Sequence, residues 1–283
     1  MKQKVIVILG QTATGKSDLA VRIARKIGGE VVSADSRQVY RGLNIGSGKI
    51  TKKEMRNVPH HLLDIVSPKR KFTVFQYQKL ANKAIREILS RGKTPIVCGG
   101  TGMYIDAITK GVIFPNVAPN PALRKRLEKK KVTELFIMLK KLDPVRAGNI
   151  DAKNKVRLVR AIEIAETLGK IPPLSVRKPE YEFQKIGLRL PPEKLKRKIE
   201  ARLFKRVKMG MISEVKKLRE SGLSWKRLEE LGLEYRYTAW YLQKKMSKEE
   251  MLKALKNEIY HFAKRQTQWF KRDKEIRWRK GGR

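Results

Sequence analysis

One stretch near the amino terminus constrains the fold of this chain more than any other. An apolar run at residues 4–9 leads into Gly10-Gln11-Thr12-Ala13-Thr14-Gly15-Lys16-Ser17, and a helical pattern of apolar residues begins directly afterwards. This is the G-x-x-x-x-G-K-[ST] loop, or P-loop, in its strand–loop–helix context. Its glycines let backbone amides surround phosphate oxygens, and the amino terminus of the next helix adds partial positive charge.

The P-loop predicts a binding site for a di- or triphosphate. Lys16 can reach the terminal phosphate, and the hydroxyl of Ser17 can hold Mg²⁺. The motif does not say that a phosphoryl group is transferred, so the chemistry has to be sought elsewhere in the chain.

Basic residues dominate the charge of the chain. Lysine and arginine number 67 against 27 aspartates and glutamates, which gives a net charge of +40 over 283 residues. A polyanion is the expected partner, and nucleic acid is the best candidate. The alternative is that part of the excess only solvates the surface, as in thermophile-like compositions.

The composition also indicates the compartment. Cys98 is the single cysteine, so no intrachain disulfide can form and a reducing compartment is expected. No secretory signal or membrane-spanning run is visible, because the first apolar run is short and leads straight into the P-loop. We therefore expect a cytoplasmic protein without a membrane partner.

Strand and helix patterns alternate through the first third of the chain. A helix is expected after the P-loop and another from Phe75 to Arg91, and the intervening apolar runs are expected strands at Val5–Leu9, Glu30–Ala34 and Pro95–Cys98. This order predicts an α/β fold, a P-loop NTPase-like parallel sheet covered by helices. Ligands of such sheets bind at the carboxyl ends of the strands, where the P-loop, residues 35–38 and residues 99–102 would meet.

Prolines at residues 115, 119 and 121 mark a change of character. From Ala122 to about Gly169 the pattern is helical and basic, and Ile186–Leu190 reads as a strand that returns to the sheet. We expect an α/β core of residues 1–114 and 181–283 with helices in its C-terminal part, and a mostly helical insertion of residues 115–180.

Two residues at expected strand ends could carry chemistry. Asp35 could hold Mg²⁺ through water or act as a general base, although an aspartate is a weak base near neutrality; the alternative is a helix N-cap. Thr101, in the turn Gly99-Gly100-Thr101-Gly102, could direct its hydroxyl to an anion or cap the following helix.

Arg157 and Arg160 are spaced to share one helix face, which suits phosphate recognition. The alternative is an ordinary solvated face on which Glu163 is their partner.

Several segments together resemble the tRNA dimethylallyltransferase (tRNA isopentenyltransferase) family over nearly the whole chain. The most specific are Asp35-Ser36-Arg37-Gln38-Val39-Tyr40 and Gly99-Gly100-Thr101-Gly102-Met103-Tyr104. The others are the P-loop, residues 59–64, 120–124, 157–163, 232–236 and 263–270. In one departure, Gln11 stands where the family often has proline.

The resemblance implies alkyl transfer. A dimethylallyl group would pass from dimethylallyl diphosphate to the exocyclic N6 amine of the adenosine 3′-adjacent to the tRNA anticodon. The P-loop, with Mg²⁺ near Ser17, would hold the diphosphate; Lys16 and Thr101 would assist its departure, and Asp35 would accept the proton. A monomer suffices for this mechanism.

The resemblance also implies which residues contact tRNA. The target base would leave the anticodon loop for a pocket near the expected proton acceptor, as in other base-modifying enzymes. The implied contacts are Asp35, Ser36, Arg37, Gln38, Thr101, Arg124, Arg157, Arg160, Tyr235 and Arg236.

Two rival functions stay open from the residues alone. A P-loop kinase of a small molecule explains the loop and Asp35 but not the charge. A nucleotide-regulated, ATP-binding RNA-binding protein explains the loop and the charge but gives Asp35 and Thr101 no task.

Overall fold

The computed structural model describes residues 2–173 and 175–281, which form two compact units. The core unit comprises the chain up to Gly111 and from Lys178 onward, and the helical unit comprises Val112–Arg177. Each boundary lies three residues from the one expected from the sequence.

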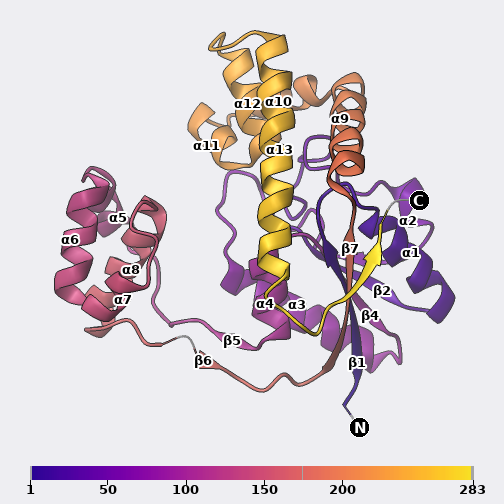
Figure 1. The fold of residues 1–283 in the computed structure, drawn as a ribbon, viewed down its shortest axis with the longest axis horizontal. Helices are drawn as coiled ribbons and strands as arrows, with labels where there is room; N and C mark the ends of the chain where they lie inside the picture. Colours follow the sequence, from indigo (N-terminus) through magenta and orange to yellow (C-terminus); the bar gives the residue numbers. More distant parts are fainter. Residues whose placement is uncertain (1, 174, 282–283) are drawn as a thin grey trace. The chain divides into compact units, whose positions relative to one another are not determined.

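The core unit is built on a six-stranded sheet in the order β3-β2-β4-β1-β7-β8, in which every neighbouring pair is parallel (Figure 1). The strands are β1 (Lys4–Gly10), β2 (Glu30–Ala34), β3 (His60–His61), β4 (Pro95–Gly99), β7 (Glu182–Arg189) and β8 (Arg277–Lys280). Strand β1 lies at the centre, between β4 and β7. The expected α/β fold with a parallel sheet is therefore confirmed.

Helices cover both faces of this sheet because β1 is apolar on both sides. Val5, Val7 and Leu9 pack on one face with residues of α3 (Val74–Ser90) and α4 (Gly102–Thr109). Ile8 packs on the other face with α1 (Lys16–Ile27). Alternate residues of a strand point to opposite faces, so one continuous apolar run forms two cores.

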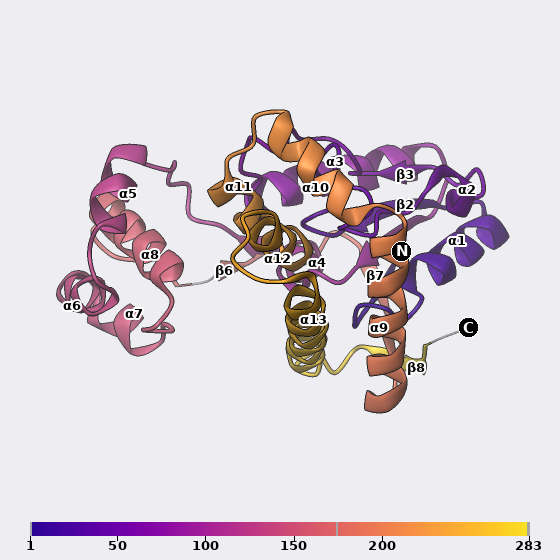
Figure 2. The same ribbon diagram turned by 90° about the horizontal axis from the view of Figure 1, so that it is seen from above.

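A helical segment between β7 and β8 lies beyond the carboxyl ends of the strands. It contains α9 (Pro192–Lys208), α10 (Met211–Glu220), α11 (Trp225–Glu230), α12 (Leu233–Leu242) and α13 (Lys248–Phe270). Helices α9 and α13 lie side by side in both views (Figures 1 and 2) and share an apolar seam that includes Leu203 and Ile259. The cluster α10–α12 packs on Val39, Tyr40 and Leu43. It thereby places helices next to the segment that follows β2.

The helical unit contains α5 (Pro121–Glu128), α6 (Val132–Leu142), α7 (Pro144–Gly148) and α8 (Lys155–Leu168). Their core consists mainly of leucines, among them Leu127 and Leu139, together with Ile162 and smaller apolar residues. The short strands β5 (Val112–Ile113) and β6 (Ser175–Val176) pair antiparallel. In the part of the chain that the structure describes, no helix has the length and apolarity needed to cross a membrane.

Candidate active site

The P-loop follows β1 and requires glycine at both ends. At Gly10 the backbone φ is 130°, and a Cβ atom there would lie 2.2 Å from the carbonyl oxygen of Leu188. Gly15 is the N-cap of α1 and has a φ of 87°. These left-handed conformations favour glycine, and they turn the loop so that α1 begins at Lys16. The loop therefore has the local geometry of a phosphate cradle.

Two glutamines tie the P-loop to distant elements. The Gln11 amide donates to Thr267 Oγ1 at 2.8 Å and accepts from the backbone amide of Leu190 at 3.2 Å. Gln266 of α13 accepts from the Thr12 amide at 2.7 Å and donates to the Gly100 carbonyl at 2.8 Å. The loop after β1 and the turn after β4 are thus both bound to α13. This gives Gln266, in the family segment 263–270, a structural role.

The cations of the cradle are partly desolvated. Lys16 Nζ donates to the Gln11 carbonyl at 2.5 Å; burial lowers the pKa of Lys16 to about 8, and nearby Arg202 adds to this. Arg202 of α9 donates from Nη2 to Thr12 Oγ1 at 2.6 Å. Burial also lowers the pKa of Arg202, but a guanidinium stays protonated at neutral pH. Two positive side chains therefore converge on the loop.

Asp35 and Thr101 lie at the ends of the neighbouring strands β2 and β4. Asp35 Oδ1 accepts from the amides of Arg37 at 2.8 Å and Gln38 at 3.3 Å in a turn that no helix follows, so the alternative role of Asp35 as a helix N-cap is wrong. Thr101 occupies the N-cap position of α4, yet its Oγ1 accepts from the amide of Ser36 at 3.0 Å instead of capping the helix. The Thr101 hydroxyl therefore keeps its hydrogen for a partner in the cavity.

One cavity of about 760 Å³ brings most of the expected site together. The expected residues that line it are Thr12, Ala13, Thr14, Gly15, Lys16, Ser17, Asp35, Ser36, Arg37, Gln38, Thr101 and Arg236. Gly10 and Gln11 are not among its lining residues. They support the loop through their contacts with Leu188, Leu190 and Thr267. Because β2, β4 and β1 are adjacent, the segments that follow them reach the cavity together, as expected for the carboxyl edge of a parallel sheet.

The expected tRNA contact at Tyr235 is wrong. Its side chain is 1% exposed and packs in the apolar cluster of α10–α12. The hydroxyl donates to Glu214 Oε1 at 2.9 Å and accepts from the amide of Ser47 at 3.1 Å. A buried tyrosine with both hydrogen-bonding directions used holds the protein's own loop and offers no surface to RNA.

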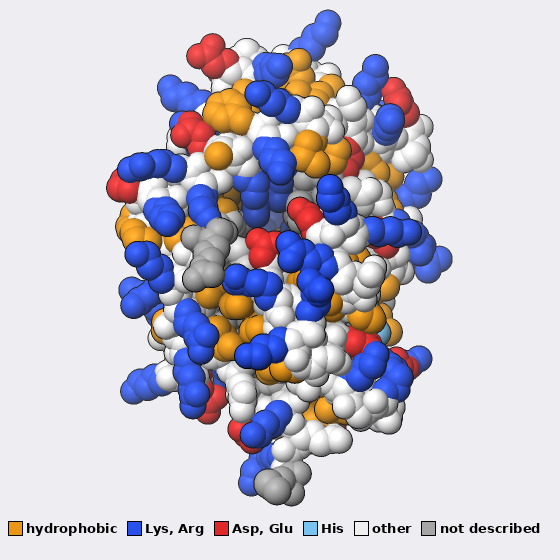
Figure 3. Space-filling view, turned by 90° about the vertical axis from the view of Figure 1, so that its right-hand side faces the viewer, with side chains coloured by type: hydrophobic (Ala, Val, Ile, Leu, Met, Phe, Trp, Pro, Cys, Tyr) orange, Lys and Arg blue, Asp and Glu red, His pale blue; other side chains and the backbone are white. Residues whose placement is uncertain are grey.

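Several basic residues of the cavity were missed by sequence reasoning. They are Lys49, Lys198, Arg202, Lys205 and Arg206, whereas Arg265, which also lines the cavity, lies in the segment 263–270 named above. The spacing of Arg202 and Arg206 places them on one face of α9, but a chain with 67 lysines and arginines offers many such pairs. Figure 3 shows basic side chains spread over an entire face of the molecule. The sequence alone therefore did not distinguish the cavity cations from the rest.

In the helical unit, a buried carboxylate organises two of the expected tRNA contacts. Glu163 is 0% exposed, pairs with Arg124 at 2.6 Å and with Arg160, and accepts from the Asn120 amide at 2.7 Å. Burial alone would raise the pKa of Glu163, but these hydrogen bonds outweigh it and lower the pKa to about 2. Arg124 and Arg160 thus stabilise the unit through Glu163, whereas Arg157 is exposed.

The chain matches a family model described as IPP transferase over residues 38–273. It is 45% identical to tRNA dimethylallyltransferase 2 of Treponema denticola, covering 96% of this chain and 92% of the relative. It is 40% identical to tRNA dimethylallyltransferase of Pelotomaculum thermopropionicum, covering 99% and 91%.

Solved structures give the same result. The tRNA isopentenylpyrophosphate transferase of Bacillus halodurans is similar with a TM-score of 0.74 and 36% identity, covering 99% of this chain and 90% of that one. A eukaryotic dimethylallyltransferase acting on tRNA is similar with a TM-score of 0.81 and 25% identity, covering 98% and 74%.

Proposed function

The chain belongs to the IPP transferase family, and from this we propose that it transfers a dimethylallyl group from dimethylallyl diphosphate to the N6 amine of the adenosine 3′-adjacent to the tRNA anticodon. One observation supports this activity above all: a phosphate cradle and the carboxylate of Asp35 line the same cavity. The phosphate cradle would hold the diphosphate that leaves the donor, and the carboxylate would take the proton that the acceptor amine must lose. The transfer needs both groups in one cavity.

The diphosphate would be held by the P-loop amides, Lys16 and Arg202. In the reaction the bond between C1 of the dimethylallyl group and the diphosphate oxygen breaks, and negative charge grows on the departing oxygen. Fixed positive groups in a desolvated site stabilise that charge without reorganisation. The hydroxyl of Thr101 would donate a further hydrogen bond at this end.

The acceptor would be the adenine amine, which forms a new bond from N6 to C1. Its lone pair is delocalised into the ring, so the amine is a poor nucleophile, and positive charge develops on N6 as the bond to C1 forms. Asp35 would then take the N6 proton, and a weak base suffices because the amine becomes acidic as the bond forms. Ser36, Arg37 and Gln38 would surround the base.

The cavity also fits Mg²⁺. The ion prefers oxygen ligands and is usually bound through one or two carboxylates together with substrate phosphates. The Ser17 hydroxyl and the carboxylate of Asp18 line the cavity and would hold it there. Among the described residues no cluster of three or more His, Cys, Asp or Glu could hold a metal alone, so the substrate phosphates would complete the site. When bound, the ion would neutralise charge on the leaving diphosphate.

The remaining cations would bind tRNA. Arg236 lines the cavity, and the exposed Arg157, with the partly exposed Arg124 and Arg160, would contact the RNA from the helical unit. We further propose that the enzyme works as a monomer in the cytoplasm.

A transfer assay tests this function. The protein is incubated with Mg²⁺, unmodified tRNA with adenosines beside the anticodon, and either labelled dimethylallyl diphosphate or γ-labelled ATP. We expect label to move to tRNA from the first donor only. Turnover of ATP without transfer of the dimethylallyl group would instead favour a kinase.

A further inference from the structure

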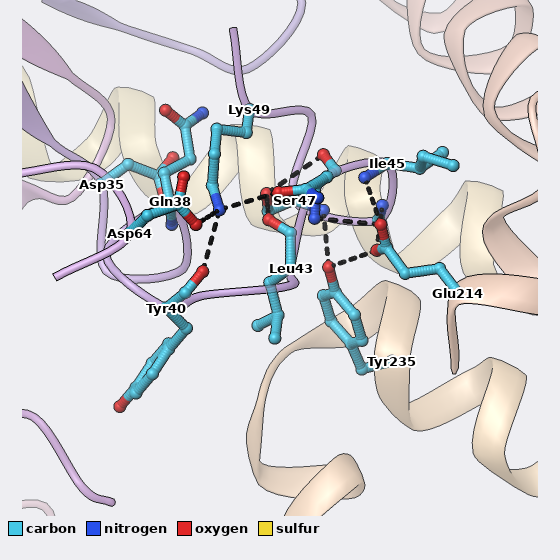
Figure 4. Close-up of polar contacts among 12 residues, drawn as sticks. Asp35, Gln38, Tyr40, Leu43, Ile45, Ser47, Lys49, Asp64, Glu214 and Tyr235 are labelled. Carbon is cyan, nitrogen blue, oxygen red and sulfur yellow. Dashed lines mark hydrogen bonds and ion pairs between the residues drawn. The ribbon is translucent and has the colours of Figure 1, made fainter. Parts of the chain in front are cut away.

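The segment of residues 43–49, here called the cavity loop, forms one wall of the cavity and has no helix or strand of its own. Four consecutive backbone amides of this loop are bound by two side chains, one from α10 and one from α12 (Figure 4). Glu214 of α10 accepts from Asn44 at 3.0 Å, Ile45 at 2.7 Å and Gly46 at 3.0 Å.

Tyr235 of α12 completes this arrangement, which we call the Glu214–Tyr235 clasp. Its hydroxyl donates to Glu214 and accepts from the Ser47 amide, so the two side chains act on one another as well as on the loop. A Cβ atom on Gly46 would lie 2.7 Å from the Tyr235 ring, so the loop and the ring are in close contact. Successive amides aimed at one carboxylate form an anion-binding nest.

The opposite end of the loop is fixed by a buried cation. Lys49, whose side chain is 5% exposed, donates to the Tyr40 carbonyl at 2.8 Å, to Asn44 Oδ1 at 3.0 Å and to Asp64 Oδ1 at 2.5 Å. Figure 4 shows Lys49 and Asp64 on one side of the loop and the clasp on the other. The loop is therefore held from both sides without any regular secondary structure.

The cavity loop connects the clasp to the acceptor side of the site. The Gly48 carbonyl accepts from Gln38 Nε2 at 3.2 Å, and the backbone amide of Gln38 donates to Asp35. With its Nε2 on the loop, Gln38 keeps Oε1 as an acceptor for a donor such as a base amine. The donor side, by contrast, is held by Gln11 and Gln266, and neither residue contacts the clasp.

We propose that Glu214 and Tyr235 are positioning residues for the acceptor nucleotide. The clasp fixes the position of the cavity loop, and the loop orients the side-chain amide of Gln38 through the Gly48 carbonyl. Gln38 then binds the target base beside Asp35, while diphosphate binding is independent of the clasp. This inference rests on the proposed transfer to an adenosine and adds the elements that shape its pocket.

The test is Tyr235→Phe, which removes one hydroxyl and leaves the ring packing in place. With an anticodon stem–loop as acceptor, we expect the KM for the stem–loop to rise about tenfold, because the half-buried Ser47 amide loses its partner, and the KM for dimethylallyl diphosphate to stay within twofold. Glu214→Gln should act in the same direction. Hydrogen exchange at the amides of residues 44–47 should become faster in both variants.

The matched control is Tyr241→Phe on the same helix, whose hydroxyl makes no hydrogen bond to the described residues; both KM values should stay unchanged. Faster exchange in the loop with an unchanged KM for the stem–loop would overturn the proposal, as would an equal rise in both KM values. If the wild type transferred nothing, the proposed function would fall, and the Kd of the labelled stem–loop for each variant would still decide the positioning claim.

Discussion

At the scale of single residues, the cavity depends on groups whose surroundings change their ordinary behaviour. Lys16 is a partly desolvated cation. Thr101 occupies an N-cap position, but its side chain accepts from the amide of Ser36 after β2. Asp35 uses one carboxylate oxygen to accept from the Arg37 amide in its own turn. Asp35 and Thr101 follow β2 and β4, and Lys16 begins the helix that follows β1 through the P-loop. The relative positions of their backbones therefore depend on the sheet.

The pKa of Lys16 makes donor use dependent on pH. Only the protonated amine attracts a diphosphate, and burial lowers the pKa of the free enzyme's Lys16 to about 8. The charge is therefore present below pH 8 and is lost as the pH rises above it. We expect kcat/KM for dimethylallyl diphosphate to fall about fivefold between pH 8 and pH 9, since this parameter reports the free enzyme.

Lys16→Arg separates this effect from others, because arginine stays protonated throughout that range. The variant should lose absolute activity through altered geometry but show a flat profile from pH 8 to pH 9. An identical decline in the wild type and the variant would assign the titration to another group.

At the scale of elements, the strands that could be predicted from the sequence are those with a clear local pattern of apolar residues and turn residues. The strand Glu30–Ala34 was predicted with its exact bounds because its valines lie between the glycines at 28–29 and the turn that begins at Asp35. Strand β7 begins at Glu182, earlier than the expected Ile186, because residues 182–185 read Glu-Phe-Gln-Lys and contain no apolar run. Strand β8 reads Arg-Trp-Arg-Lys; as an edge strand with mostly exposed side chains, it has no apolar pattern.

The site could be predicted only where a motif spans contiguous residues. The P-loop, residues 35–38 and Thr101 meet as expected because parallel strands bring their carboxyl ends together. Arg202 was missed, since its helix places it there through tertiary packing on α13. Tyr235 was misassigned because a family motif says that a residue matters but not whether it is exposed.

The helical unit offers a test of an element-scale interaction. Glu163→Gln removes the charge that two arginines share, and we expect the unit to lose roughly 3 kcal/mol of stability. Hydrogen exchange in α5 and α8 measures this loss. The control is Glu166→Gln on the same helix, whose carboxylate is 3.6 Å from the exposed Arg126 and should change stability by under about 0.5 kcal/mol. Equal protection in both variants would show that Glu163 is not an organising residue.

Acid should act on the wild type in the same way. Glu163 has a pKa of about 2 in the folded unit against an ordinary value of 4.5, so its contribution is complete above pH 4.5 and declines as the pH falls toward 2.

At the scale of the whole molecule, the net charge of +40 is the feature with the widest consequences. Basic residues are abundant in both units and crowd the face shown in Figure 3. Binding that neutralises phosphates releases counterions, so its strength falls steeply with salt. The charge thus predicts a property of the tRNA complex that no single residue controls.

We expect the Kd for tRNA to rise about 100-fold between 50 and 200 mM monovalent salt, as for a protein that neutralises several phosphates. Fluorescence anisotropy with labelled tRNA measures this directly. The Kd for dimethylallyl diphosphate, measured in the same buffers, should rise much less, because its site is partly desolvated. A tRNA affinity indifferent to salt would mean that the basic surface does not bind the RNA.

The most direct test of the whole account is single-turnover transfer by Asp35→Asn. Asparagine keeps the turn, since its side-chain oxygen can accept from the Arg37 amide, but it cannot take the N6 proton. Asp151→Asn is the control, because Asp151 accepts from the Lys153 amide in a similar turn outside the core unit. We expect Asp35→Asn to lower the rate of transfer by about 10²–10⁴ with the Kd for tRNA within threefold of the wild type. An unchanged rate, or a loss that follows tRNA binding alone, would contradict the assignment of Asp35 as the proton acceptor.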